Sequence, residues 1–564
     1  MDRTETRPLE LPPAIRGLNL FTTDRDLQRR LARRSPDLLP RFGDRLAEFG
    51  AWVGEAVEAQ ADYTSRHAPP RLESHDGAGA PVGRVVLNAE YRACHADAYR
   101  RGIIGLAFGP EGAPHLLSFV MGGVLSQADV SLHCPVTLTG AVAWVLDRLA
   151  PDPVRSRWLP LLTRMDGQAL SGGTWATELH GGTDVAATTT VAEPDGAAWR
   201  LTGLKWFTSN AGAGAALATA RPRGAPDGAR GLGCYLVPSV LPDGTPNRLH
   251  VRRLKDKVGT RGLATGETVL DSAWAVEVAP PPHGLKAMLE ALEYSRVHNA
   301  FGAAGLHRRA LLESLAWTSH RRVGGTLLRS TPMMRDALLD LAAAQEASAA
   351  LAFEAAMAFE APGEDPAVEG WRRAAVALAK YWTAAEATAA AAQAVEIVGG
   401  NGYTEEWPTA RLYRDALVTA VWEGPANVQA LEFLRATIGK LPGDRALLDR
   451  VSGILDSAPG ALRPIAVRLR PVLDGCRAGF AHLRARPEDG PRLARRLMHP
   501  AAELLAAALM LEEAAADLPE GDRRKALMAG RFAARFDPQG TVDLAEDPLH
   551  ALFDDIIGYG LCPA

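Results

Sequence analysis

The chain has 564 residues, a formal net charge of −4, a 47% apolar fraction and a 23% charged fraction. This length is too great for one small core and favours three or four structural units. The balanced charge excludes an overall basic field of the kind that indicates a nucleic-acid partner. The alanine-rich, aromatic-poor composition favours helix over most of the chain.

The five cysteines are scattered, odd in number and never spaced as C-x-x-C. This pattern argues against a disulfide framework and a structural zinc site, and no metal is predicted. The charged N-terminus leads into no apolar segment, and nowhere do about 18 uncharged apolar residues run together. We therefore expect a soluble, cytoplasmic protein without a membrane span.

The first half of the chain contains two regions of different amino-acid composition. Residues 1–168 carry helical stretches such as Asp44–Ala59 and an apolar run around Leu116–Val130. Residues 169–284 are rich in Thr, Val and Gly, with Pro-Asp-Gly triplets that mark turns between short strand-like runs. The sequence predicts an N-terminal helical domain followed by an antiparallel β-domain.

The second half returns to helical texture. Apolar residues recur at i, i+3, i+4 and i+7 in residues 285–440, which predicts a four-helix bundle. A Leu-Pro-Gly break begins a helical extension over 441–564. The predicted fold class is mainly α with a central β-domain. The helices of the bundle are expected at 287–321, 332–360, 366–398 and 424–438.

Glu423 is the candidate catalytic residue. It precedes an expected helix start and is flanked by the apolar Val421 and Trp422. A carboxylate in a water-poor setting has a raised pKa, which suits proton abstraction from carbon. The alternative is a carboxylate that only interacts with the dipole of the following helix.

The surrounding segment resembles the C-terminal signature of acyl-CoA dehydrogenases. The matching landmarks are Gly399-Gly400, then Arg411 with Arg414-Asp415, then Glu423-Gly424. The resemblance implies an FAD-dependent flavoprotein with the fold described above. In that family the glutamate removes the α-proton of an acyl thioester while the β-hydrogen leaves as hydride to flavin N5. The resemblance therefore implies α,β-dehydrogenation of an acyl-CoA with Glu423 as base.

Two further segments resemble the family's flavin-binding motifs in the β-domain. Trp175–Asp184 is similar to Thr-Glu-x-x-x-Gly-Ser-Asp, and Gly203–Asn210 is similar to Gly-x-Lys-x-Trp-Ile-Thr-Asn. An ordinary polar turn is the alternative for the first segment, and a core aromatic for the second. The cofactor-binding residues implied by the resemblance are Trp175, Ala176, Thr177, Gly182, Thr183, Phe207, Thr208 and Ser209.

The bundle supplies the remaining cofactor candidates. Arg321 matches an arginine that reaches the cofactor of a neighbouring subunit, although Gly324 replaces the family's Phe in that turn. A cation at a helix end is the alternative for Arg321. Trp422, Gly424 and Asn427 are expected on the flavin side of the turn that carries the base, where Pro425 replaces the family's Thr.

Other stretches resemble the AidB-like, alkylation-response branch of the family: Cys134–Thr139, Asn247–Arg261 and the ending Tyr559–Ala564. That branch implies a homotetramer and an extension associated with double-stranded DNA. Residues 460–500 contain nine Arg and three acidic residues, which gives this stretch a net charge of 9 − 3 = +6. Arginine side chains bind phosphate groups well, and we expect these residues to bind DNA independently of its base sequence. The candidates are Arg484, Arg486, Arg492, Arg495 and Arg496, with solvated faces or intersubunit salt bridges as the alternative.

Two functions remain open from the sequence. The first is an acyl-CoA dehydrogenase, whose aliphatic substrate chain requires an apolar pocket. The second is a DNA-binding protective flavoprotein with little or no dehydrogenase turnover.

Overall fold

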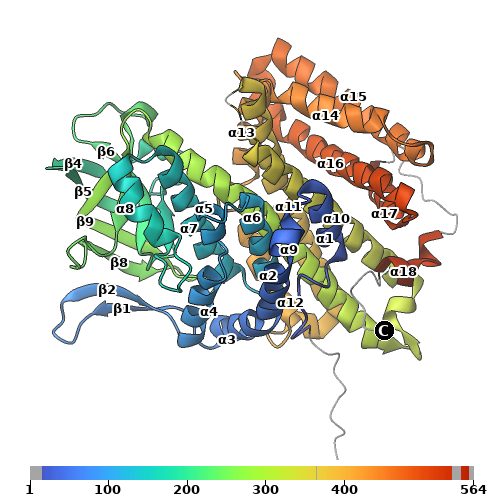
Figure 1. Cartoon of the computed structure of the whole chain (residues 1–564), viewed down its shortest axis with the longest axis horizontal. Helices are drawn as coiled ribbons and strands as arrows, with labels where there is room; N and C mark the ends of the chain where they lie inside the picture. The colour runs from blue at the N-terminus through green and yellow to red at the C-terminus, as the bar shows by residue number, and fades with distance from the viewer. Residues whose placement is uncertain (1–14, 362, 364, 537–547, 558–564) are drawn as a thin grey trace, which may run out of the picture.

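The computed structural model describes residues 15–361, 363, 365–536 and 548–557. The β-domain lies at one end of the molecule and the C-terminal extension at the other, with the long helices between them (Figure 1). The predicted fold class, mainly α with a central β-domain, is confirmed. The N-terminal helices are α1 (Arg25–Arg34), α2 (Leu38–Trp52), α3 (Glu58–Arg66), α4 (Ala89–Arg100), α5 (Gly105–Phe108), α6 (His115–Ser126), α7 (Val130–Leu149) and α8 (Asp152–Leu162).

Helices α6 and α7 form the centre of the N-terminal part and are apolar on nearly all sides, as helices enclosed by others are. They pack against the long helix α9 (Gly284–His320). Within the described residues, α7 is the one helix long and apolar enough to cross a bilayer, and 94% of its apolar window is buried inside the protein. Its hydrophobicity is therefore used in the core.

A hairpin interrupts the N-terminal helices where the sequence predicts only helix. Strands β1 (Arg71–His75) and β2 (Pro81–Val86) pair antiparallel and are largely exposed. Their few inward side chains, including Leu72 and Val85, pack against the β-domain at Val251. An isolated two-stranded hairpin is marginal in water, so its stability comes from this docking, which local sequence does not show.

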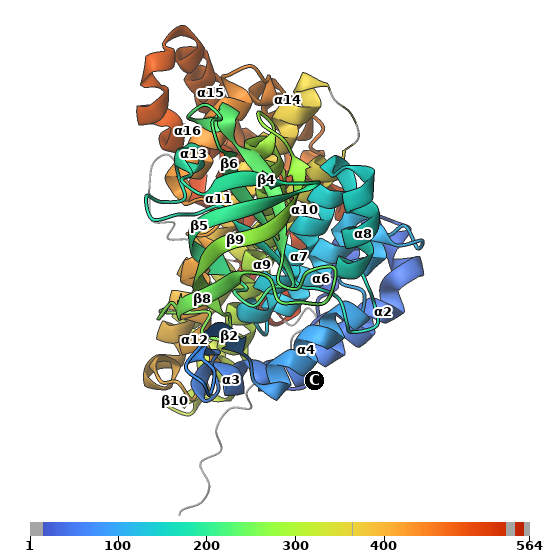
Figure 2. The ribbon, with the colours of Figure 1, turned by 90° about the vertical axis from the view of Figure 1, so that its left-hand side faces the viewer.

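The β-domain is a closed ring of strands with additional strands at its edges. The ring runs β4–β5–β9–β7–β6 and back to β4, and its core includes Trp175, Leu201 and Tyr235. Figure 2 shows this sheet from the side that faces away from the extension. The strands are β3 (Gly172–Trp175), β4 (Val191–Asp195), β5 (Ala198–Ser209), β6 (Ala215–Pro222), β7 (Gly233–Pro238), β8 (Leu249–Leu254) and β9 (Thr265–Ala279).

The prediction of a purely antiparallel β-domain is wrong. Both β3 and β4 run parallel to β6, whereas the other pairings of the sheet are antiparallel. Turn triplets specify hairpins between consecutive strands, but β3 and β4 reach β6 through longer connections. Closure of the ring sets their direction, and no local pattern carries that information.

The bundle consists of α9, α10 (Pro332–Glu360), α11 (Pro366–Val398), α12 (Pro408–Thr419) and α13 (Ala426–Thr437). Helix α12 covers the Arg-x-x-Arg-Asp landmark, for which the sequence analysis predicts no helix.

The charged residues of that landmark join domains. Arg411 Nη1 donates to the Ala128 carbonyl oxygen (2.7 Å) and Nη2 pairs with Glu58 (3.3 Å). Asp415 accepts the backbone N–H of Thr260 from the β-domain. In this chain the landmark therefore positions the bundle against the two preceding domains.

The extension packs on α10, α11 and α13 (Figure 1). Its attachment depends on a buried ionic group that we call the Lys525 cluster: Asp26, Arg30, Glu346, Glu513 and Lys525. The extension comprises α14 (Gly443–Asp456), α15 (Arg463–Ala485), α16 (Gly490–Asp517), α17 (Arg524–Ala533) and α18 (Phe553–Ile557).

The Lys525 cluster links the first and last parts of the chain. Lys525 Nζ contacts Asp26, Glu346 (2.5 Å) and Glu513 (3.2 Å), and the lysine is 3% exposed. Arg30 pairs with Asp26 (2.9 Å) and Glu513 (2.6 Å). Lys525 thus contributes to packing. The ending Tyr559–Ala564 lies outside the described residues.

Connections separate these parts at three places. The helix α8 ends ten residues before β3 begins, β9 ends five residues before α9, and α13 ends six residues before α14. The predicted boundaries at 168, 284 and 440 lie at or within one residue of these connections.

Candidate active site

Glu423 lies in the turn between α12 and α13. Its backbone adopts the left-handed region (φ +51°), and Gly424 follows at φ +103°. Arg296 Nε donates to the Glu423 carbonyl oxygen (3.1 Å), and Gln429 Nε2 donates to the same oxygen (2.9 Å). Lys380 Nζ donates to the Gly424 carbonyl oxygen (2.7 Å). A non-glycine residue in this region is strained, and surrounding contacts of this kind hold such a conformation at functional sites.

One oxygen of the Glu423 carboxyl group is shielded from water. Its Oε2 is buried and has no hydrogen-bond partner among the described residues. Burial raises the pKa of Glu423 to about 7, against the lowering effect of the Lys380 and Arg296 charges. Burial also lowers the pKa of Lys380, which is 1% exposed. The group is therefore placed to take up a proton near neutral pH.

Lys380 and Arg296 are site residues that the sequence analysis missed. The only signal for Lys380 was a single cation after the apolar run Ala374–Ala379. A lysine at that place in a helix is more often a solvated side chain, and only the packing of α11 against the turn shows its role.

A narrow cavity of about 10 Å³ opens beside Glu423, between α7, α9 and the turn. Its surface is mostly apolar, as the sequence analysis expects of a pocket for an aliphatic chain. Several of the lining residues are polar, but they contribute only a small part of that surface. The lining residues are Ser126, Val130, His133, Cys134, Thr137, Ser295, Asn299, Gly302, Thr419, Trp422 and Glu423.

The first β-domain motif forms a compact turn beside β5. The Trp206 backbone N–H donates to the Thr177 carbonyl oxygen (2.9 Å). A Cβ at Gly182 would lie 2.6 Å from Thr177 Oγ1, so only glycine leaves this hydroxyl in place. Thr183 and Gly182 are exposed, and Ala176 is half-buried. Ala176, Thr177, Gly182 and Thr183 thus share one surface region.

The acidic residue of the same motif has a structural role. Glu178 is buried and accepts hydrogen bonds from Lys205 Nζ (2.7 Å) and from the hydroxyls of Thr189 and Thr190 (2.6 Å each). Although burial alone would raise the pKa of Glu178, the Lys205 ammonium lowers it to about 2. This pair fixes the loop that follows Thr183.

The second β-domain motif divides between two faces of β5. Phe207 is 50% exposed and Ser209 is half-buried. Thr208 points the opposite way and its hydroxyl lies 2.7 Å from that of Thr268 inside the domain. Trp175 is 1% exposed and packs in the β-domain core. The side chains of Thr208 and Trp175 therefore do not face the surface shared by Phe207 and Ser209.

One junction joins this part of the β-domain to the Glu423 turn. Ser209 lies opposite Thr265 in the β5–β9 register. Two residues before Thr265, the side chain of Leu263 packs against Cys134 and Trp422. The end of β5 and the turn with Glu423 thus lie on either side of the same connection.

Two other predicted cofactor residues lie apart from the junction. Arg321 is exposed at the end of α9, 25 residues beyond Arg296, or about 37 Å along the helix. Within one chain it does not approach Glu423. Asn427 is exposed and lines an open groove between the bundle and α16.

That groove also contains three of the five predicted DNA-binding arginines. Its volume is about 720 Å³, and Arg492, Arg495, Arg496 and His499 line it from α16. Arg484 instead pairs with the buried Asp444 (2.6 Å) and does not line the groove. Outside the groove, Arg486 lies near Glu488 (3.4 Å) and Asp489 (3.7 Å).

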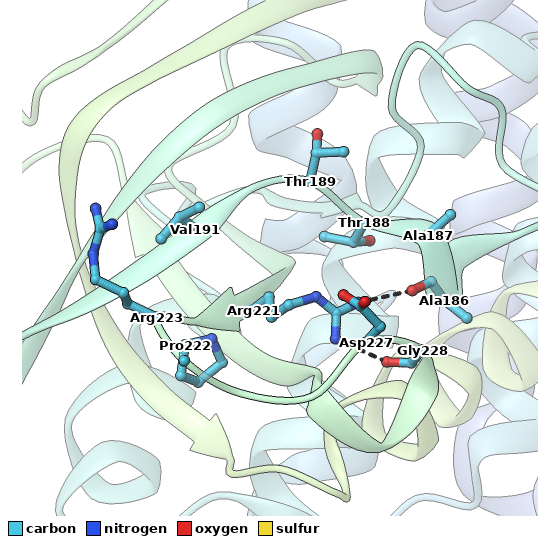
Figure 3. Close-up of a pocket in the computed structure, with 11 residues that line it drawn as sticks. Ala186, Ala187, Thr188, Thr189, Val191, Arg221, Pro222, Arg223, Asp227 and Gly228 are labelled. Atoms are coloured by element: carbon cyan, nitrogen blue, oxygen red, sulfur yellow. Dashed lines mark hydrogen bonds between the residues drawn. The ribbon is translucent and has the colours of Figure 1, made fainter.

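A further recess on the β-domain contains none of the predicted residues (Figure 3). Arg221 points across it, and its guanidinium donates to the carbonyl oxygens of Ala186 (2.8 Å) and Gly228 (3.0 Å). These bonds occupy the cation in holding two loops together, so the recess is a structural feature of the domain.

Comparisons with known proteins agree with this arrangement. Residues 10–166 match the adaptive response protein AidB N-terminal domain. Residues 173–273 match the acyl-CoA dehydrogenase middle domain and 282–438 its C-terminal domain. The chain is 30% identical over 444 residues to the putative acyl-CoA dehydrogenase AidB of Escherichia coli (strain K12), covering 75% of this chain and 79% of that protein.

Similar structures extend the match into the C-terminal extension. The Caenorhabditis elegans ACDH-11 in complex with C11-CoA superposes with a TM-score of 0.87 at 25% identity, over 96% of this chain and 95% of that one. Bd2924 in its apo-form gives a TM-score of 0.78 at 27% identity, over 88% and 98%. The family is FAD-dependent. The chain belongs to the acyl-CoA dehydrogenase family, in its AidB-like branch.

Proposed function

We propose that this protein dehydrogenates an acyl-CoA between its α and β carbons, with Glu423 as the base and FAD as the hydride acceptor. The observation that carries the proposal is the Glu423 carboxyl group, whose Oε2 is buried without a hydrogen-bond partner among the described residues and which lines a narrow cavity. A base with a pKa near 7 is half ionised at neutral pH, which favours proton abstraction. The turn held by Arg296, Lys380 and Gln429 orients it.

The residues at the junction fit FAD. Phe207 presents a half-exposed ring, and the Thr177 hydroxyl keeps its place because residue 182 is glycine. When bound there, FAD supplies the acceptor for the hydride. The chain's own residues exclude water from Glu423, orient its carboxyl group and hold the abstracted proton on it.

Anaerobic titration of the FAD-loaded protein with saturated acyl-CoAs tests the proposal. The flavin absorbance should bleach as the substrate is oxidised, with a stoichiometry of one acyl-CoA per flavin. If no acyl-CoA in a panel of chain lengths and branching patterns bleaches the flavin, the proposed function is wrong.

Replacing Lys380 by Met should shift the pH dependence of flavin reduction. The wild-type rate is expected to rise with pH through about 7, because Glu423 must be deprotonated to act. The Lys380 cation lowers the pKa of Glu423, so its removal should move this rise to higher pH. Stopped-flow reduction rates between pH 6 and 9 measure the shift.

One control accompanies the Lys380 experiment. Lys286→Met removes a lysine of α9 that does not line the cavity. It should leave the pH profile of flavin reduction unchanged. An unshifted profile in Lys380→Met would show that this lysine has no influence on the base.

The assembly is also part of the proposal. We expect a homotetramer in which Arg321 reaches the cofactor of a neighbouring subunit, since the arginine lies too far from Glu423 within one chain. Light scattering gives the mass of the particle, and Arg321→Ala should weaken FAD retention if the neighbour's cofactor is its partner.

A second candidate function, association with double-stranded DNA and the alkylation response, is favoured by the groove on α16. Arg495 and Arg496 line it and form no ion pair within the described part of the chain. Two such arginines beside Arg492 offer donors for phosphate oxygens. In this second function the chain is a DNA-binding protective flavoprotein that contains FAD but has little or no dehydrogenase turnover.

The logarithm of the DNA association constant falls linearly with the logarithm of the salt concentration. The double variant Arg495→Glu, Arg496→Glu should make this slope less steep by about 2, one unit per lost phosphate contact. Gel retardation of double-stranded DNA at several salt concentrations measures this slope. Arg470→Glu with Arg477→Glu, the same charge change on α15, is the matched control. DNA retention that is equal in both double variants would exclude the groove as the binding surface.

A further inference from the structure

The loop between β8 and β9 runs from the β-domain to the bundle and contains the half-buried Lys257. At Gly259 the loop lies directly on α12, where an added Cβ would come within 2.3 Å of the Arg414 carbonyl oxygen. The next residue, Thr260, donates its backbone N–H to Asp415. The loop is therefore attached to both domains, and Lys257 is held at their boundary.

Lys257 bonds to the two residues that form the junction between the β-domain and the Glu423 turn. Its Nζ donates to the Leu263 carbonyl oxygen (2.7 Å) and to Thr265 Oγ1 (3.0 Å). Leu263 packs against Trp422, and Thr265 lies opposite Ser209 in the β5–β9 register. The ammonium group therefore lies where the turn with the base meets the strand end that is predicted to bind the flavin.

A single thiol lies close to both Lys257 and the base. Cys134 lines the cavity beside Glu423, and the charges of Glu423 and Lys257 both act on the pKa of its thiol. Burial raises that pKa, so the thiol is neutral and provides no counter-charge for the lysine. Lys257 and Glu423 are thus neighbours of the same uncharged group.

Lys257 has no carboxylate partner among the described residues. Both of its acceptors are neutral oxygens, and one of the three N–H donors of the ammonium group is left over. The buried lysines Lys205 and Lys525 show the usual arrangement, in which the cation pairs with one carboxylate or with several. Removing a charge from water without such a pair is unfavourable, so the bare cation indicates an acceptor that the described residues do not supply.

The lysine carries its charge at neutral pH. Burial lowers the pKa of Lys257 to about 8, which leaves most of the amine protonated at pH 7. The carboxylate of Asp415 opposes this effect from α12, but it accepts the backbone N–H of Thr260 and does not pair with the ammonium group. The junction therefore contains a positive charge that the neighbouring side chains do not neutralise.

Hydride uptake by a flavin creates the kind of charge that this cation would stabilise. A hydride brings two electrons and one proton to a neutral ring system, so the isoalloxazine ring becomes negative, and a cation near it favours reduction. Lys380 and Arg296 donate to backbone oxygens of the turn with the base. Lys255, two residues before Lys257, pairs with Glu267 (2.6 Å). These neighbouring cations already have partners, whereas Lys257 does not.

We propose that Lys257 stabilises the reduced state of FAD at the junction by placing its unpaired positive charge beside the isoalloxazine ring. The inference rests on the proposed function for the position of FAD. It goes further because it identifies a residue that sets how readily the flavin accepts electrons. The cation acts on the flavin and not on the acyl chain, so its effect is present without any acyl-CoA.

The test measures the midpoint potential of the FAD-loaded protein without acyl-CoA, by equilibration with a reference dye during anaerobic reduction. Lys257→Gln keeps a donor for the Leu263 carbonyl oxygen but removes the charge. Its potential should be more negative by about 30 mV or more, which corresponds to about a 10-fold change in the equilibrium constant of two-electron reduction. The dissociation constant of oxidised FAD, measured by fluorescence titration, should change little because the oxidised ring is neutral.

Three further variants accompany this measurement. Lys257→Met is a second uncharged variant and has the same expected potential as Lys257→Gln. Lys257→Arg retains the charge and should stay near the wild-type potential. Lys440→Gln, at an exposed position after α13, loses the same charge away from the junction and should leave the potential unchanged. A lysine that only ties the loop would lower the free energy of unfolding in the uncharged variants without moving the potential.

The outcomes separate this inference from the dehydrogenase function. If both uncharged variants keep the wild-type potential while acyl-CoAs bleach the wild-type flavin, the inference is overturned and the dehydrogenase function stands. If the potential falls as expected but no acyl-CoA bleaches the flavin, the inference stands and the dehydrogenase function fails. An equal fall in Lys440→Gln, or weaker acyl-CoA binding at an unchanged potential, would also overturn the assignment of Lys257 to the flavin.

Discussion

Replacing Glu423 by Gln is expected to reduce the rate of flavin reduction by acyl-CoA on the order of 10⁴-fold, the upper range for loss of a general base. Glutamine keeps the size of the side chain but cannot accept the proton. The turn should keep its conformation, because Arg296, Gln429 and Lys380 hold it through backbone oxygens. The protein should therefore remain yellow, and anaerobic stopped-flow absorbance measures the rate.

The matched control for this variant is Glu396→Gln, an exposed glutamate at the end of α11. It loses the same charge and should reduce flavin at the wild-type rate. A Glu423→Gln protein that binds FAD and still reduces it within about 10-fold of the wild-type rate would assign the base to another group.

Replacing Lys525 by Met is expected to lower the free energy of unfolding by about 3–5 kcal/mol. The substitution leaves the carboxylates of Asp26, Glu346 and Glu513 in a buried site with too few cations. Within that site, burial would lower the pKa of Lys525, yet the three carboxylates together raise it. Urea unfolding measures the change from the midpoint at constant slope.

Arg477→Met is the control for the Lys525 experiment. It breaks the exposed ion pair with Asp474 on α15 and should cost less than about 1 kcal/mol. Equal costs for the two variants would show that the Lys525 cluster contributes no more than a surface ion pair.

The sequence predicts the fold well where amino-acid composition and the spacing of apolar residues identify the helices and strands. The change from helical to Thr-Val-Gly texture near residue 169 and the helical periods of α9, α10 and α11 identify the fold class. The hairpin β1–β2 and the parallel pairings of β6 are missed because both depend on contacts with distant segments. Propensity over five residues does not contain those contacts.

In the candidate site too, the sequence predicts some features and misses others. The motif around Glu423 predicts a carboxylate in the turn before a helix, and the structure has it there. Alternation along β5 would have separated Thr208 from Phe207 and Ser209, because neighbouring residues of a strand point to opposite faces. The cavity beside Glu423 was not predictable, since Ser126, His133 and Ser295 come from three helices that only the tertiary fold brings together.

The Lys525 cluster also has a consequence for how the chain is made. Asp26 is synthesised almost five hundred residues before its buried counter-ion Lys525. At 5–20 residues per second, translation separates the two by about half a minute to two minutes. During that interval α1 carries a carboxylate destined for the interior with only its own Arg30 as partner. The ribosome must therefore synthesise almost five hundred further residues before α1 reaches its final environment.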